Sequence, residues 1–197
     1  MNHNLRSVCV FCGSSPGLDP AYSQAATLVG QLLAEHGITL VYGGGGLGLM
    51  GTTARAALAA GGEVVGIIPG AMQEREGVAE SVTELIIVPS MHARKALMER
   101  RSDAFLALPG GFGTFEELCE MITWQQLGIH RKPIVLLNTN GYYDPMLAMF
   151  DQGVTAGFIS PANRTSVISV SNPDEVLQAL QGAELPPAHA FLWPDQT

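Results

Sequence analysis

Short apolar segments alternate with longer amphipathic segments along nearly the whole chain. The apolar segments are rich in β-branched residues or leucine and are bounded by glycine or proline, which is typical of strands buried on both faces of a parallel sheet. They cover residues 8–11, 39–42, 64–68, 85–88, 104–108 and 134–137, and a weaker one covers 167–170. The pattern predicts strands and helices in alternation.

The segments between the predicted strands carry helix start and stop signals. Asp19 and Pro20 supply a capping acceptor and a first-turn proline before a helix over 21–35, and Gly37 follows as the residue that ends it. Asp-Pro at 144–145 and Asn-Pro at 172–173 repeat this start signal. We therefore predict a doubly wound α/β fold, in which a mostly parallel sheet carries helices on both faces.

No internal repeat and no long linker divides the sequence, so we expect one domain over residues 1–197. A polar connecting loop is expected over 71–81 and an irregular tail from about residue 184.

Composition and charge narrow the class of protein. Apolar residues make up 47% of the chain, enough for a substantial core. The net charge is −8 and the ten lysine and arginine residues form no basic face, which argues against a nucleic-acid partner. The first apolar segment is too short for a signal peptide or a membrane span, so we expect a cytoplasmic protein without a membrane partner.

Cys9 and Cys12 form a lone C-x-x-C in the first apolar run of the sequence. A zinc site would need a second cysteine pair or histidines at ligand spacing, and neither is present. We interpret these residues as small buried thiols in a reducing compartment and expect no metal.

The richest loops follow the predicted strands and therefore lie at the carboxyl edge of the sheet, where ligands bind in such folds. In the turn over 109–117, we expect Gly110, Gly111 and Gly113 to adopt positive φ and approach a ligand closely. The helix that follows begins with unpaired N–H groups and the positive end of its dipole. The turn predicts a phosphate site, with Glu116 and Glu117 in the first helical turn.

The loop over 43–48 matches G-x-G-x-x-G between a strand and a helix. A dinucleotide site also needs an acid at the end of the next strand, but Glu63 precedes that strand. No loop carries the G-K-[ST] of a Walker A motif. The glycines serve either close helix–strand packing or backbone donation to a mononucleotide or sugar phosphate.

Two features near the predicted cleft have competing interpretations. Arg94 follows a strand end, and its forked guanidinium suits a phosphate or a purine edge. Lys95 instead fits a solvated helix face with an i, i+4 pair to Glu99.

Thr114 and Glu117 match a capping box, with Thr114 as N-cap. Alternatively, Glu117 beside a ribose phosphate orients water or stabilises an oxocarbenium-like sugar.

Three motifs in order, at 43–51, 91–95 and 109–117, resemble those of the Lonely Guy family, and the resemblance extends over roughly residues 8–180. It implies a Rossmann-like fold and a homodimer. It further implies an N-glycosidase, a phosphoribohydrolase that converts N6-substituted adenosine 5′-monophosphates to free base and ribose 5-phosphate in cytokinin activation. The residues that it assigns are Arg94 and Glu117 for catalysis, and Gly110, Gly111, Gly113 and Thr114 for the phosphate.

Further candidate contacts to the nucleotide lie on the neighbouring loops and helices. They are Ser14, Gly44, Gly45, Met91, Lys95 and Glu116, of which Glu116 is also expected to favour the helix dipole. Met91, Met98, Met121 and Trp124 either supply a pocket for an alkyl group or, as is usual for such apolar stripes, belong to the core.

Other activities compete with this one. A nucleosidase acting on plain AMP differs only in the base pocket, and a molybdenum-cofactor carrier would hold a phosphorylated ligand without cleaving it. We expect no cofactor. The older label of the family, lysine decarboxylase, requires a Schiff-base lysine for pyridoxal phosphate, but Lys132 precedes its strand and Lys95 lacks a partner for the pyridinium nitrogen.

Overall fold

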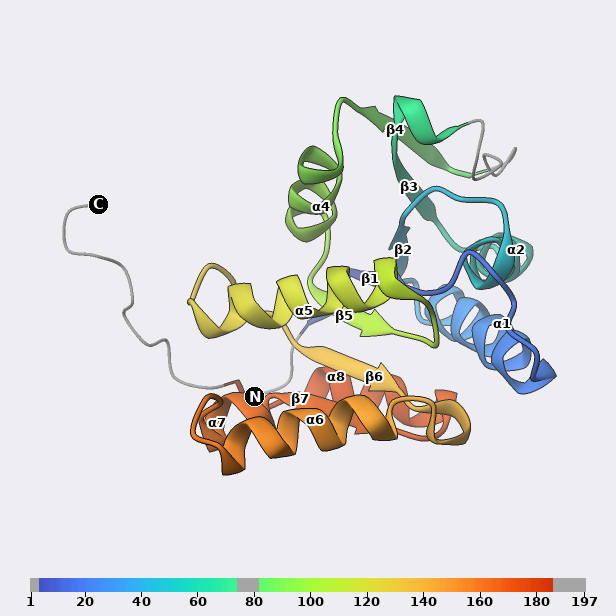
Figure 1. Ribbon diagram of the computed structural model, residues 1–197. Coiled ribbons are helices and arrows are strands. Elements are labelled where there is room, and N and C mark those ends of the chain that lie inside the picture. The colour runs from blue at the N-terminus through green and yellow to red at the C-terminus, as the bar shows by residue number, and fades with distance from the viewer. Residues whose placement is uncertain (1–3, 74–81, 186–197) are drawn as a thin grey trace.

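A computed structural model describes residues 4–73 and 82–185, which form a seven-stranded sheet flanked by helices (Figure 1). All six strand pairings are parallel, in the order β4-β3-β2-β1-β5-β6-β7. The strands are β1 (Ser7–Phe11), β2 (Thr39–Tyr42), β3 (Val64–Pro69), β4 (Glu84–Val88), β5 (Ala104–Ala107), β6 (Ile134–Leu137) and β7 (Val167–Val170).

The strand order places a topological switch at β1. The chain runs outward from β1 to β4 and then returns to add β5 on the other side of β1. The connections that leave β1 and β5 therefore diverge, which opens a crevice at their carboxyl ends.

Helices cover both faces of the sheet, as predicted. Alternate residues of each strand point to opposite faces, so Val8 and Val10 join one core cluster while Cys9 and Phe11 join the other. The first cluster includes α1 (Pro20–Glu35), α2 (Gly48–Ala59) and α8 (Val176–Gly182). The second includes α4 (Met91–Arg100), α5 (Phe112–Gln126) and α6 (Asp144–Thr155), one below another in Figure 1.

Shorter helical segments complete the described chain. They are α7 (Pro161–Thr165) and the 3-10 turns η1 (Gly70–Met72), η2 (Thr139–Gly141) and η3 (Pro173–Glu175). The predicted connection at 71–81 thus begins in η1, and its remainder over 74–81 lies outside the described residues. The predicted tail lies mostly over 186–197, which the structure does not describe. Within the described ranges, no helix is long and apolar enough to cross a bilayer.

The capping prediction is confirmed for α1. The Asp19 carboxylate accepts from the Ala21 N–H at 2.9 Å, and Gly37 has φ +64° after the helix. The prediction for Asp144 is wrong, because Tyr143 occupies the N-cap and Asp144 lies inside α6. Its carboxylate instead accepts from the Asn138 side chain at 2.7 Å.

Cys9 and Cys12 are buried and free, as predicted. Burial, followed by the negative charge of Glu117, raises the pKa of both thiols. Both groups are therefore protonated near neutral pH and act as small apolar side chains.

His130 is a buried histidine beside the amino end of β6, where it is 5% exposed. Its Nε2 lies 3.0 Å from the Met121 carbonyl oxygen, and its Nδ1 accepts from the Lys132 N–H at 3.2 Å. Burial and then the charge of Lys132 lower the pKa of His130 to about 4. The imidazole therefore folds in its neutral form.

This environment predicts an acid sensitivity of folding. In the unfolded chain, the His130 imidazole is protonated below about pH 6.5, whereas in the folded protein it is protonated only below about pH 4. Stability should fall as pH drops through that window, by up to about 3 kcal/mol. Urea unfolding of the wild type and of His130→Gln between about pH 4 and pH 7 measures the free energy of unfolding at each pH. The variant should show a smaller dependence of this free energy on pH, because it lacks the contribution of His130. The exposed His36 provides the control variant His36→Gln, which should keep it. An unchanged slope in His130→Gln would contradict the prediction.

Candidate active site

Two adjoining cavities open at the carboxyl ends of the strands, and both are lined by Gly13, Ser14 and Gly111. The Glu117 cavity, of about 250 Å³, is also lined by Arg94, the start of α5 and three methionines. The Tyr142 cavity, of about 240 Å³, is also lined by Tyr22, Leu49 and the 109–110 turn. The crevice predicted from the strand order is therefore lined by the loop after β1 and by the glycine turn after β5.

The start of α5 forms one wall of the Glu117 cavity. The helix begins at Phe112, its N-cap is Gly111, and no side chain caps it. The predicted capping box is wrong, because Thr114 and Glu117 lie two and five residues inside the helix start. The extended backbone of Gly111, at φ −97° and ψ −158°, lets the helix begin earlier than the threonine suggests. The first-turn N–H groups are left available for an anion.

The expected conformation of the three glycines is also wrong. Gly110, Gly111 and Gly113 are absent from the positive-φ residues. A Cβ at Gly110 would overlap the Thr114 side chain, whereas one at Gly111 or Gly113 would meet no atom of the described structure within 4 Å. Glycine at 111 and 113 thus leaves the backbone open to the cavity rather than relieving strain.

Two tyrosines that follow β6 hold the turn between β5 and α5 through hydrogen bonds to its carbonyl groups. The Tyr142 hydroxyl donates to the Gly110 carbonyl, and the Tyr143 hydroxyl donates to the Leu108 carbonyl at 2.6 Å. Tyr143 is fully buried, and burial raises its pKa, so its hydroxyl stays a donor. Neither tyrosine was predicted as part of the site, although a position just after a predicted strand could have placed both at this edge.

Arg94 enters the cavity from α4 and is 4% exposed. Its Nε donates to the Ile67 carbonyl at 3.1 Å and its Nη2 donates to the Gly43 carbonyl at 2.8 Å. Its Nη1 lies 3.9 Å from Glu117 Oε1. Two main-chain carbonyls at the ends of β2 and β3 thus orient the guanidinium toward the carboxylate.

The glycine loop after β2 makes room for this arginine. A Cβ at Gly43 would collide with Arg94 Nη2, while Gly44 and Gly48 have φ +78° and +56°. Gly44 and Gly45 are buried and are not among the residues that line the two cavities. Glu63 lies with other charged residues at the amino edge of the sheet, as predicted, and lines neither of the two cavities.

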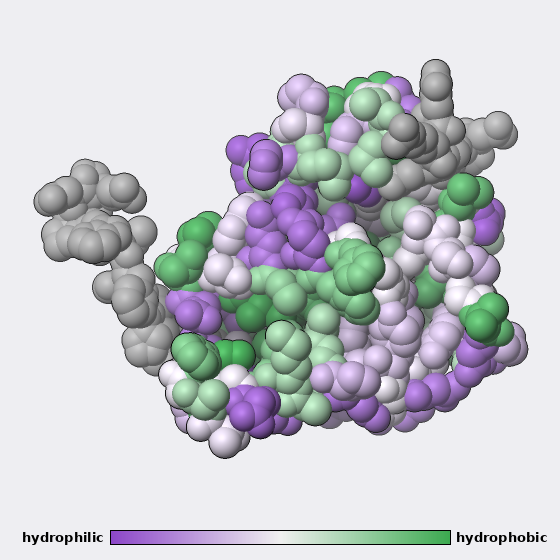
Figure 2. Space-filling view, viewed as in Figure 1, coloured by the Kyte–Doolittle hydropathy of each residue, from purple (hydrophilic) through white to green (hydrophobic). Residues whose placement is uncertain are grey.

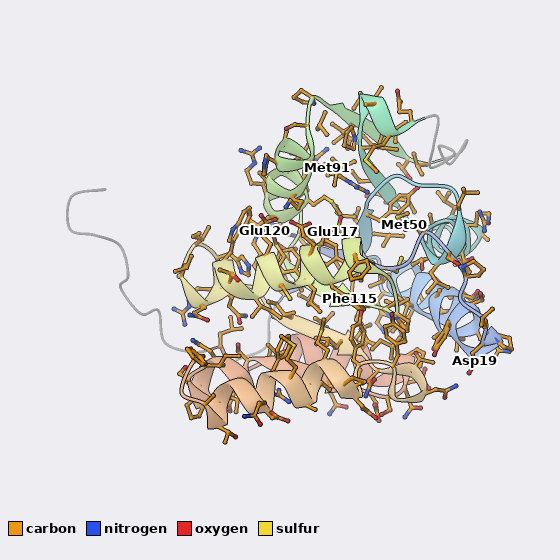
Figure 3. The ribbon with its side chains drawn as sticks, viewed as in Figure 1. Asp19, Met50, Met91, Phe115, Glu117 and Glu120 are labelled. Carbon is orange, nitrogen blue, oxygen red and sulfur yellow. The ribbon has the colours of Figure 1, made fainter. Side chains whose placement is uncertain are left out.

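Glu117 projects from the second turn of α5, and its side chain is 12% exposed. Figure 3 shows it at the end of α5 that faces Met50 and Met91, with Glu120 one turn further along. Glu116 also lines the cavity, but it lies beyond the first helical turn, where the dipole role was predicted.

Lys95 differs from its predicted environment. It is buried, and its ammonium contacts Glu116 and Glu120 of α5 rather than Glu99. Glu99 instead pairs with Lys132 near the amino edge of the sheet. Helical spacing predicted the wrong partner because α5 packs closely enough to supply two carboxylates.

Methionines form the apolar side of the Glu117 cavity. Met91 lies there as expected, together with Met50 and Met72, which our sequence analysis missed. Met98 and Met121 instead belong to the core, and Trp124 packs against it.

The arrangement does not suit two other kinds of chemistry. Both lysines of the chain pair with carboxylates, and neither lines the Glu117 cavity, so neither is placed for a Schiff base there. Over residues 4–73 and 82–185, no three His, Cys, Asp or Glu side chains gather as a metal site.

The family described as possible lysine decarboxylase matches residues 50–180. A probable cytokinin riboside 5′-monophosphate phosphoribohydrolase from Oryza sativa subsp. japonica is 52% identical over 185 residues, which is 94% of this chain and 75% of the relative. A cytokinin riboside 5′-monophosphate phosphoribohydrolase from Arabidopsis thaliana is 50% identical over 180 residues, which is 91% of this chain and 83% of the relative. The chain belongs to the Lonely Guy family. The predicted resemblance is thereby confirmed.

A solved structure confirms the Rossmann-like fold of this Lonely Guy protein. The molybdenum cofactor carrier protein of Chlamydomonas reinhardtii superposes with a TM-score of 0.68, covering 91% of this chain and 98% of the carrier. At 23% identity, the similarity concerns the fold alone.

Because the backbone at Gly113 is open, we expect substitution there to lower ligand affinity without lowering the stability of the fold. In Gly113→Ala, the methyl group meets no protein atom, and alanine stabilises a helix by up to about 1 kcal/mol over glycine. The methyl would project over the α5 start, so affinity for ribose 5-phosphate should fall more than about tenfold. Calorimetric binding and thermal unfolding measure both quantities.

Gly182→Ala is the matched control, because its Cβ also meets nothing and it lies at the end of α8. It should leave ribose 5-phosphate binding unchanged. Wild-type affinity in a folded Gly113→Ala protein would contradict the assignment of the α5 start to phosphate.

Proposed function

We propose that this protein hydrolyses the N-glycosidic bond of N6-substituted adenosine 5′-monophosphates, releasing the free base and ribose 5-phosphate. The observation that carries the proposal is the placement of the Glu117 carboxylate beside an uncapped helix start, 3.9 Å from a buried arginine. The printed names of relatives about half identical to the chain support the same reaction.

The phosphate is assigned to the start of α5. The N–H groups of the first turn, the small residues Gly111 and Gly113, and the helix dipole all favour a dianion there. Ser14 lines both cavities beside this turn and is assigned as a further polar contact. Thr114 packs against Gly110 and also lines the Glu117 cavity, so it is assigned to shape the turn and to offer its backbone N–H to the phosphate.

Glu117 lies one helical turn beyond the phosphate position, within reach of a ribose. Its carboxylate orients a water molecule toward C1′ and stabilises the positive charge that develops on the sugar. As the C1′–N bond breaks, its electron pair leaves with the base, water supplies the new hydroxyl at C1′, and the base gains a proton. Arg94 stays protonated and therefore supports the phosphate or the departing base electrostatically.

The three methionines that line the Glu117 cavity favour an N6-substituted adenine over the unsubstituted adenine of AMP. Met50, Met72 and Met91 come from α2, η1 and α4, and their unbranched side chains adapt to alkyl groups of different shape. A plain adenine would leave part of this apolar surface uncovered.

We also propose a cytoplasmic homodimer. Exposed Leu127 and Ile129, which follow Trp124 at the end of α5, support association through this region.

Glu117→Gln tests the reaction. The amide keeps the shape of the side chain but removes the charge, so kcat should fall by about 10²–10⁴-fold in the folded variant. Chromatography of free base and ribose 5-phosphate, after incubation with isopentenyladenosine monophosphate, measures the rate. Glu35→Gln, at the end of α1, is the control.

Absence of turnover by the wild-type protein would overturn the proposed reaction, and tight stoichiometric binding without turnover would favour a carrier. Unchanged turnover by Glu117→Gln would overturn the role of this carboxylate.

Met72→Ala tests base selection. Loss of the thioether side chain removes apolar contacts worth about 1.5 kcal/mol, so the preference for isopentenyladenosine monophosphate over AMP should fall about tenfold. The ratio of the two kcat/KM values measures this preference. Met149→Ala, an exposed residue of α6, should leave the ratio unchanged. An unaltered ratio in Met72→Ala would contradict the assignment of this wall.

A further inference from the structure

Two consecutive residues of α4 contact three carboxylates of α5. Arg94 faces Glu117, and Lys95 pairs with Glu116 and Glu120 on either side of it. The distance from Lys95 Nζ to Glu120 Oε2 is 3.0 Å, and the contact to Glu116 is closer. Figure 2 shows hydrophilic side chains gathered where the two helices meet.

The two helices that carry Arg94 and Glu117 rest on different parts of the sheet. α4 packs mainly on β3 and β4, whereas α5 packs on β1 and β5. The guanidinium is held on the β2–β3 side of the sheet, whereas the carboxylate is carried by α5 on β1 and β5. The Lys95 ion pairs link the two helices directly, beside the Arg94 and Glu117 side chains.

The ion pair of Lys95 with Glu120 is partly desolvated, whereas Glu116 is 54% exposed. The Lys95 side chain is 7% exposed and Glu120 is 23% exposed, so solvent screens this pair less than a surface ion pair. Burial opposes the charge on Lys95, but the hydrogen bonds and charges of Glu116 and Glu120 outweigh it and raise the pKa of Lys95. The ammonium also offsets the mutual repulsion of three carboxylates beside a phosphate site.

We propose that Lys95 is a positioning residue, whose ammonium clamps α4 to α5 through Glu116 and Glu120 and so sets the distance between Arg94 and Glu117. It replaces the phosphate-contact role expected for Lys95 from sequence. The inference rests on the proposed function, because the clamped pair is the one assigned to hydrolysis.

Lys132 offers a matched control. It also forms a partly buried ion pair with a carboxylate of α4, Glu99, but near the amino edge of the sheet. Lys95→Met leaves two carboxylates of α5 without their ammonium partner and Lys132→Met leaves one of α4, so both should lower thermal stability. Only Lys95→Met should lower kcat, by about 10–100-fold, because small displacements of catalytic groups have effects of that size.

The split between kcat and KM distinguishes positioning from ligand contact. In Lys95→Met, KM and the affinity for ribose 5-phosphate should change less than about threefold. The effect of Lys95→Met on kcat should also largely vanish in a Glu116→Gln/Glu120→Gln background, because the clamp is already broken there. Should Lys95→Met not fold, Glu120→Gln alone breaks one of the two ion pairs and should give a smaller fall in kcat.

Three results would overturn the inference. These are a loss of ribose 5-phosphate affinity with kcat preserved, an equal loss of kcat in Lys132→Met, and wild-type kcat in folded Lys95→Met and Glu120→Gln proteins. Failure of the proposed reaction itself is separate, since it would appear as absence of turnover by the wild-type protein.

Discussion

The site depends on one buried guanidinium held by main-chain carbonyls. Arg94 is anchored by the carbonyls of Ile67 and Gly43, groups fixed by the strands and not by other side chains. A buried charge is costly unless it is hydrogen-bonded and paired, and here both requirements are met at the edge of the sheet. The loop after β2 must therefore have glycine at position 43, where a Cβ would collide with the guanidinium. The fixed guanidinium in turn gives the Glu117 carboxylate a positively charged partner at a defined position.

The two glycine motifs therefore have different physical purposes. The loop over 43–48 makes space for an arginine and for close packing against Ser14, while the turn at 110–113 exposes backbone to the cavity. Neither purpose is that of a dinucleotide fingerprint, although the spacing of the first loop matches one. The acid that such a fingerprint requires lies at the opposite edge of the sheet.

The sequence predicted most of the fold because its local signals agree with the tertiary structure. The strands at 39–42, 134–137 and 167–170 have the predicted bounds, and the others differ by one residue at an end. Capping predictions failed where a backbone conformation or a neighbouring loop decided the outcome, at Gly111 and at Asp144. The partners of Lys95 and the positions of Met50 and Met72 depend on how α4, α5 and η1 meet, which periodicity within one helix does not contain. Roles assigned to individual site residues remain predictions.

The tyrosine supports of the 108–111 turn have a thermodynamic consequence. Tyr142 and Tyr143 belong to the segment after β6, and they hold two carbonyls of the turn without any ligand. A phosphate that binds here meets a preorganised turn and pays little entropy for ordering it. The last third of the chain, which supplies no assigned catalytic group, thereby helps to set the conformation of the turn that leads into α5.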